Sequence, residues 1–131
     1  MMDASPTIDQ ELAALESGAL DLAKFPHRDH VRLAFHMLER YPLGEAITRF
    51  AGGLKLLTQK IGKPEVYHET VTVAFLAVIG ERRAKLAAGT AWEEFIRLNP
   101  DLLEKDCLQQ WYSADVLGSD LARRTFILPR R

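Results

Sequence analysis

Residues 64–89, PEVYHETVTVAFLAVIGERRAKLAAG, constrain the fold more than any other part of the chain. Glu69 near the start and Arg82 and Arg83 near the end suit the dipole of an α-helix, which we expect over 66–88. The β-branched residues would also fit a strand, but the length of the segment and its charged ends favour a helix. Because the middle of the segment is apolar nearly all round, other elements are expected to surround this helix.

Most of the remaining chain also shows the apolar spacing and the start and stop residues of helices. The expected starts are Thr7 with Gln10 as a capping box, Asp29, Leu43, Thr90 with Glu93, Pro100, and either Ser113 or Ser119. The sequence therefore predicts an all-α protein, an irregular bundle of about six helices joined by short connections. Residues 1–131 are expected to form a single domain, with 1–6 loose and 130–131 as a tail.

Two adjacent glycines, Gly52 and Gly53, lie in the middle of the helix expected after Leu43. Glycine inside a helix costs roughly 1 kcal/mol relative to alanine, so the pair requires a structural reason. The simplest reasons are a close crossing with another helix or a kink.

The overall composition is that of an ordinary globular protein and narrows the choice of partners. The chain has seventeen basic and eighteen acidic residues, which gives a net charge of −1. No overall positive field would attract a polyanion, so nucleic acid is disfavoured as a partner. A lone cysteine, Cys107, and a start without a signal segment predict a reducing, cytoplasmic setting. The apolar runs are too short to cross a membrane.

The best candidate site comes from the histidines, three of four of which lie in KFPHRDHVRLAFHMLERYP, residues 24–42. His27 and His30 are three positions apart and are neighbours on a helix, whereas His36 points elsewhere. His68 is expected in the first turn of the 66–88 helix. If the two helix starts converge, His27, His30 and His68 would form a facial set of ligands for zinc or non-haem iron.

In the enzyme hypothesis, a small molecule binds at the open positions of that metal. Glu69 would act as a base or a further ligand, while Tyr67 and Arg123 would contact the substrate, Tyr67 also serving as a catalytic group. Hydrolysis, isomerisation and oxygen chemistry are not distinguished by these residues.

Two other interpretations use the same sequence. Histidines spaced three apart arise often by chance, so the same residues would equally form a metal-free pocket with neutral imidazoles and Tyr67 holding a small ligand, or structural hydrogen bonds. A third class is an interaction protein that forms a homodimer through an exposed apolar helix face.

Several other residues have both a structural and a functional interpretation. Trp111 and Tyr112 could line a pocket, although aromatic residues at helix ends more often form the edge of a core. Thr70 and Thr72 are expected to hydrogen-bond back to their own helix, and Cys107 to be buried. The chain has no nucleophile elbow, no dithiol motif and no phosphate loop.

Three phrases of the sequence resemble those of a family of short bacterial proteins without an assigned activity. The phrases are F-x-H-x-D-H, Y-H-E-T and A-R-x-x-F-x-x-P, and the likeness spans residues 25–129. It covers Phe25, His27, Asp29, His30, Tyr67, His68, Glu69, Thr70, Ala122, Arg123, Phe126 and Pro129. The resemblance implies that the three phrases belong to one fold, and it implies no substrate.

Overall fold

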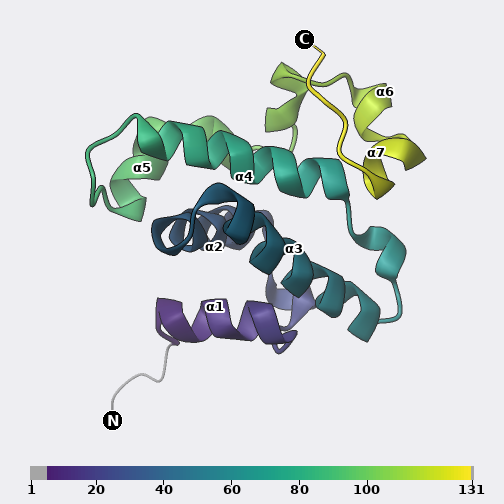
Figure 1. Ribbon diagram of the computed structural model, residues 1–131, viewed down its shortest axis with the longest axis horizontal. Coiled ribbons are helices and arrows are strands. Elements are labelled where there is room, and N and C mark those ends of the chain that lie inside the picture. Colours follow the sequence, from purple (N-terminus) through teal and green to yellow (C-terminus); the bar gives the residue numbers. More distant parts are fainter. Residues whose placement is uncertain (1–5, 131) are drawn as a thin grey trace.

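The computed structural model describes residues 6–130 and shows an all-α fold (Figure 1). The expectation of a loose start over 1–6 falls almost entirely outside the described residues, as does the last position of the expected tail. The α-helices are α1 Ile8–Ser17, α2 His27–Arg40, α3 Leu43–Lys60, α4 Glu69–Ala84, α5 Trp92–Leu98, α6 Ala114–Leu117 and α7 Asp120–Arg124. Four 3-10 turns are η1 Leu22–Lys24, η2 Pro64–Val66, η3 Pro100–Leu103 and η4 Cys107–Gln110.

The helices are stacked in layers around α2 and α3. Helix α1 packs on α3 and α2 from one side, and α4 packs on the same two helices from the other (Figure 1). The C-terminal part of the chain, with α6 and α7, lies on the far side of α4. The long, evenly apolar helix expected from the sequence is therefore central, as its composition predicts.

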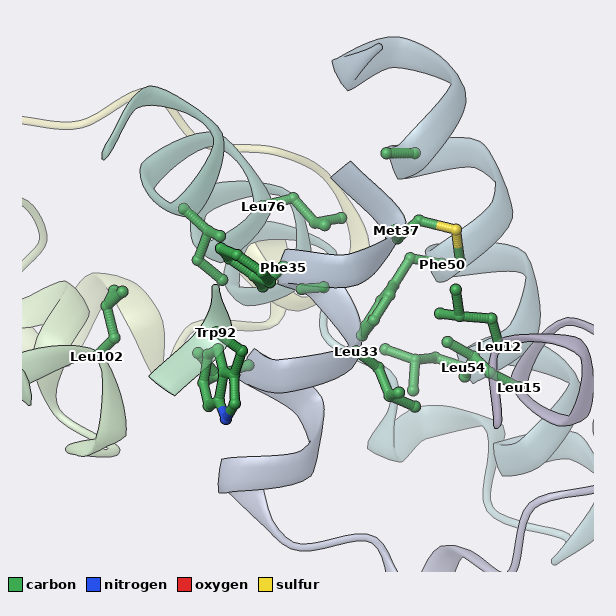
Figure 2. Packing of buried hydrophobic residues seen from close by; sticks show 14 of the residues in the cluster. Leu12, Leu15, Leu33, Phe35, Met37, Phe50, Leu54, Leu76, Trp92 and Leu102 are labelled. Atoms are coloured by element: carbon green, nitrogen blue, oxygen red, sulfur yellow. The ribbon is translucent and has the colours of Figure 1, made fainter. Parts of the chain in front are cut away.

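The core is a continuous apolar cluster to which α1, α2, α3, α4 and α5 contribute. Figure 2 shows Phe35 and Trp92 close together on one side, with Leu12, Leu15 and Leu54 grouped on the other. Phe35 and Leu15 are fully buried. Full burial of such side chains stabilises a fold by about 1.5–3 kcal/mol each.

Only Gly53 of the Gly52–Gly53 pair is required by a close contact between helices. A β-carbon on Gly53 would overlap the backbone carbonyl of Leu15, whereas one on Gly52 would meet nothing within 4 Å. The close helix crossing expected from the sequence is thus confirmed and is assigned to Gly53, where α1 meets α3.

Several predicted helix starts are confirmed. Thr7 and Gln10 form a reciprocal capping box, and Gly18 ends α1 in the left-handed conformation with a φ of 75°. Ser113 and Ser119, expected as alternatives, each cap a separate short helix through the side-chain oxygen.

Other predicted boundaries are wrong, for local reasons. Helix α2 begins at His27, before the expected cap Asp29. The reason is that the Pro26 carbonyl already accepts hydrogen bonds from the backbone amides of Asp29 and His30, three and four residues ahead. Thr90 donates to the Ala87 carbonyl, and Ala91 is the N-cap of α5. The segment from Pro100 forms two 3-10 turns, η3 and η4.

The 66–88 helix is also shorter than expected, since α4 covers Glu69–Ala84. Pro64–Val66 forms a separate 3-10 turn, and His68 is extended, with a φ of −125°. His68 therefore precedes the helix as its N-cap and does not lie in the first turn.

Candidate functional site

A small cavity lies where α2, α3 and α4 meet. Its volume is about 70 Å³, room for about two water molecules at the roughly 30 Å³ that each occupies in the liquid. Most of the wall is apolar, supplied by side chains such as Val31, Phe50 and Phe75. The polar part of the lining comes from His27, His30 and Thr72. We call this space the histidine cavity.

The ring of His30 is held by Phe25 through two contacts. Its Nε2 donates to the Phe25 carbonyl at 3.1 Å, and the two rings stack with centroids 4.1 Å apart. Burial lowers the pKa of His30 to about 4, an effect that the Phe25 carbonyl partly offsets and that nearby His27 reinforces. His30 is consequently neutral at pH 7, with its proton on Nε2 and a lone pair on Nδ1.

His27 is fixed in a similar way. Its Nε2 donates to the Leu102 carbonyl in η3 at 2.9 Å, and its ring meets Phe75 edge-on with centroids 5.1 Å apart. The Nδ1 atoms of His27 and His30 have no hydrogen-bond partner within residues 6–130, yet that part of the chain contains no buried, unpaired side-chain nitrogen or oxygen. Each Nδ1 therefore faces space that a water molecule can reach.

His68 lies apart from this cavity, and both of its ring nitrogens have partners. Nδ1 accepts from the Val71 amide at 3.1 Å, and Nε2 donates to the Leu117 carbonyl at 2.7 Å. His68 thus caps α4 and joins it to α6. This is the structural type of role that a histidine at a helix start commonly has.

The set of metal ligands expected from the sequence is not assembled here. Within residues 6–130, no group of three or more His, Cys, Asp or Glu side chains is placed to hold a metal ion. His27 and His30 line one cavity. His68 does not line it, and its two ring nitrogens are hydrogen-bonded to the backbone of Val71 and Leu117. His36 is elsewhere, with Nδ1 2.6 Å from a Glu39 oxygen.

Tyr67 and Glu69, the expected catalytic groups, bind one another at the start of α4. The Tyr67 hydroxyl donates to Glu69 Oε1 at 2.5 Å. Burial, and then the Glu69 carboxylate, raise the pKa of Tyr67, while the neighbouring Thr72 side chain partly offsets them. Both residues are thus near the α4 wall of the histidine cavity without lining it.

Arg123, the expected substrate contact, is engaged with the protein itself. Its guanidinium donates to Asp120 at 2.6 Å and to the Glu65 carbonyl at 3.4 Å, so it joins α7 to η2. It does not line the histidine cavity.

The two threonines at the start of α4 differ from one another. Thr72 donates to the His68 carbonyl at 2.7 Å, as expected for a threonine that bonds back to its own helix. Thr70 instead donates to the Thr125 carbonyl at 2.7 Å and accepts from the Ile127 amide at 3.1 Å. Sequence reasoning missed this link, because nothing local in the chain signals a partner so far away.

The remaining wall of the histidine cavity was also missed by the sequence. Phe50, Leu54 and Leu76 are ordinary core residues by their helical spacing. Only the relative placement of three helices turns them into the lining of a cavity. Cys107, by contrast, is buried as expected, and burial raises the pKa of its thiol to about 11.

None of the helices between residues 6 and 130 has both the length and the apolar character needed to cross a membrane. Comparisons with known proteins found no match to a family model, to a curated protein or to a solved structure. The resemblance of the three phrases to uncharacterised bacterial proteins therefore stays a prediction. His68 with Leu117 and Thr70 with Thr125 do bring its second phrase against the C-terminal region that carries its third.

Proposed function

We propose that the histidine cavity binds a compact, uncharged molecule that has an apolar body and one hydrogen-bond donor. One observation carries the proposal. His27 and His30 line the same small apolar cavity, and each has its Nε2 engaged by a backbone carbonyl, so that the Nδ1 atoms are left as acceptors. The proposed role is that of a binding module without metal.

The size of the cavity sets the size and affinity of the ligand. A volume of about 70 Å³ suits a molecule of a few non-hydrogen atoms, well below the 300–1,000 Å³ of sites for larger ligands. Very small ligands gain at most about 1.5 kcal/mol per non-hydrogen atom. A molecule of about four such atoms would therefore bind no more tightly than tens of micromolar.

The test compares two molecules of equal size that differ in the donor. Propan-2-ol donates a hydrogen bond, and acetone does not. We expect propan-2-ol to shift the methyl signals of Val31, Ala34 and Leu76 in a saturable NMR titration, with acetone at least fivefold weaker. The double variant His27→Leu, His30→Leu, which removes both acceptors, should remove this preference. Equal binding of the two, or no saturable shift with either, would refute the proposal.

A second candidate keeps the metal hypothesis in a reduced form. Histidines that ligate metals usually donate their other ring N–H to a carbonyl or carboxylate, which is the arrangement of His27 and His30. An ion such as zinc or iron would then have two protein ligands, with His68 not among them.

Elemental analysis of protein purified without chelators, followed by titration with Zn²⁺ and Fe²⁺, tests this candidate. Bound metal should be lost in His27→Ala and His30→Ala and retained in His68→Ala. Loss of metal in all three variants would instead favour the three-histidine site expected from the sequence. No uptake by the unaltered protein would end both metal hypotheses.

A further inference from the structure

A second hollow lies on the other side of α4, where the C-terminal segment 125–130 passes Trp111. Its volume is about 200 Å³, and it shares no lining residue with the histidine cavity. Three aromatic side chains, Trp111, Tyr112 and Phe126, form much of the wall, and Glu81 is its charged member. We call it the aromatic hollow.

Hydrogen bonds to the backbone hold the aromatic wall in place. The Tyr112 hydroxyl donates to the Ile127 carbonyl at 2.6 Å, and the Arg130 amide donates to the Trp111 carbonyl at 3.0 Å. Small side chains of α4, Ala74 and Ala77, line the hollow between the bulky rings and leave its space open. The hollow is therefore formed before any ligand arrives, which reduces the ordering that binding would require.

The charge of the lining is negative. Glu81 is the one charged side chain among the lining residues. Its ion pair with Lys85 is long, at 3.8 Å, and both side chains are more than 70% exposed, at 73% and 72%. Exposed pairs of this kind contribute little, so Glu81 is available to another cation.

A second cation besides Lys85, the Arg82 guanidinium, lies near the hollow, but its charge is compensated. The Arg82 guanidinium is 6.0 Å from the centre of the Trp111 ring. It donates to both carboxylate oxygens of Asp101, at 2.6 and 2.9 Å, and thereby lowers the pKa of Asp101 to about 2. The Arg82–Asp101 pair is neutral as a unit and leaves Glu81 to determine the local charge.

Aromatic faces attract cations, and rings combined with a carboxylate are the arrangement that recognises quaternary ammonium groups. We propose that the aromatic hollow binds a trimethylammonium group through Trp111, Phe126 and Glu81. Such a group is apolar on its surface and positively charged as a whole, and it matches both properties of the lining. This site is independent of the histidine cavity and of its proposed ligand.

The decisive experiment compares choline with 3,3-dimethylbutan-1-ol, a molecule of the same shape without the charge. Each is titrated into the full chain and followed by the indole N–H signals, of which the two tryptophans supply one each. We expect choline to shift the Trp111 signal and not that of Trp92, which is buried in the core. Choline should bind about three- to thirtyfold more tightly than the neutral molecule.

Two variants show how much Glu81 and Trp111 each contribute to the preference for choline over the neutral molecule. Glu81→Gln alters an exposed position and should weaken choline binding about two- to fivefold while leaving the neutral molecule unaffected. Trp111→Leu keeps an apolar wall and should remove most of the remaining preference for the cation. Glu93→Gln, an exposed change on α5, is the matched control and should alter neither ligand.

A third arm identifies where the group comes from. A peptide that carries trimethyllysine and binds more tightly than choline would indicate a protein partner, and weaker binding would indicate a free small cation. The proposal is overturned if the neutral molecule binds as well as choline, or if choline causes no saturable shift of the Trp111 signal.

Discussion

The two sides of α4 differ in how much apolar packing holds their neighbours. On the side of α2 and α3, apolar side chains interdigitate and leave a cavity of only about 70 Å³. On the C-terminal side, the apolar cluster is smaller, three polar side chains bond to backbone groups, and the space left is an open hollow of about 200 Å³. These polar anchors are His68, Thr70 and Tyr112.

The length of the elements explains the difference. Helices of three or more turns present a continuous apolar face, and burying that face outweighs the loss of conformational freedom. The helices α6 and α7 have four and five residues and cannot bury such a face. The C-terminal segment packs on α4 through a smaller apolar cluster, and directed hydrogen bonds from buried groups, such as fully buried Thr70, add to that packing.

On the side of α4 that faces α2 and α3, the largest loss of stability is expected from a substitution at the crossing of α1 and α3. Gly53→Ala would drive a methyl group into the Leu15 carbonyl, and we expect a loss of about 3 kcal/mol in the free energy of unfolding. Gly52→Ala, next to it, meets nothing and should stabilise by about 0.5–1 kcal/mol. Denaturant unfolding measures both. Equal stability of the two variants would contradict the close crossing.

His30 in the histidine cavity should make the stability of the fold depend on pH. Between pH 6.5 and about 4, unfolded His30 takes up a proton that the folded protein does not bind, so stability is full above this window and falls as the pH falls through it. The expected loss from this group is about 2–3 kcal/mol.

The variant His30→Gln should flatten that part of the stability profile, measured by urea unfolding at a series of pH values. His36→Gln serves as the control, since His36 lies outside the cavity. An unchanged profile in the His30 variant would show that another group causes the acid sensitivity.

On the polar side, His68 is expected to contribute stability through its two bonds. His68→Ala should cost about 2 kcal/mol, since both the cap of α4 and the bond to Leu117 are lost. Asparagine is a good cap but is too short to reach Leu117, so His68→Asn should recover about half of the loss. Thermal unfolding checks both variants, and no loss in His68→Ala would remove His68 from the anchors.

Thr70 gives the smallest and most local effect. Thr70→Val should cost about 1–2 kcal/mol, because the Thr125 carbonyl and the Ile127 amide lose their partner. Hydrogen exchange at the Ile127 amide should become faster while the amides of α3 are unaffected. Thr48→Val, at an exposed hydroxyl bonded to Gly44 on α3, should change stability by less than about 0.5 kcal/mol. Protection that survives in Thr70→Val would mean that the C-terminal segment is held by packing.

The candidate site could be predicted only in part from the sequence. The pairing of His27 with His30 followed from their spacing on one helix, and both do line one cavity. The participation of His68 was inferred from a helix start at residue 66, three residues before the observed start of α4 at Glu69. A cap residue is extended and points its ring differently from a residue inside the first turn, so a small boundary error changed which groups His68 meets.

The sequence by itself determined those features that depend on residues within one or two helical turns along the chain. The helical class, the caps at Thr7, Ser113 and Ser119, and the stop at Gly18 all follow from such local interactions. Tertiary structure alone decided that Gly53 and not Gly52 is the contact, that His68 reaches Leu117, and that aromatic residues surround a hollow beside Glu81. These depend on how whole helices are placed against one another, and that placement is set by burial summed over many side chains rather than by any short stretch of the chain.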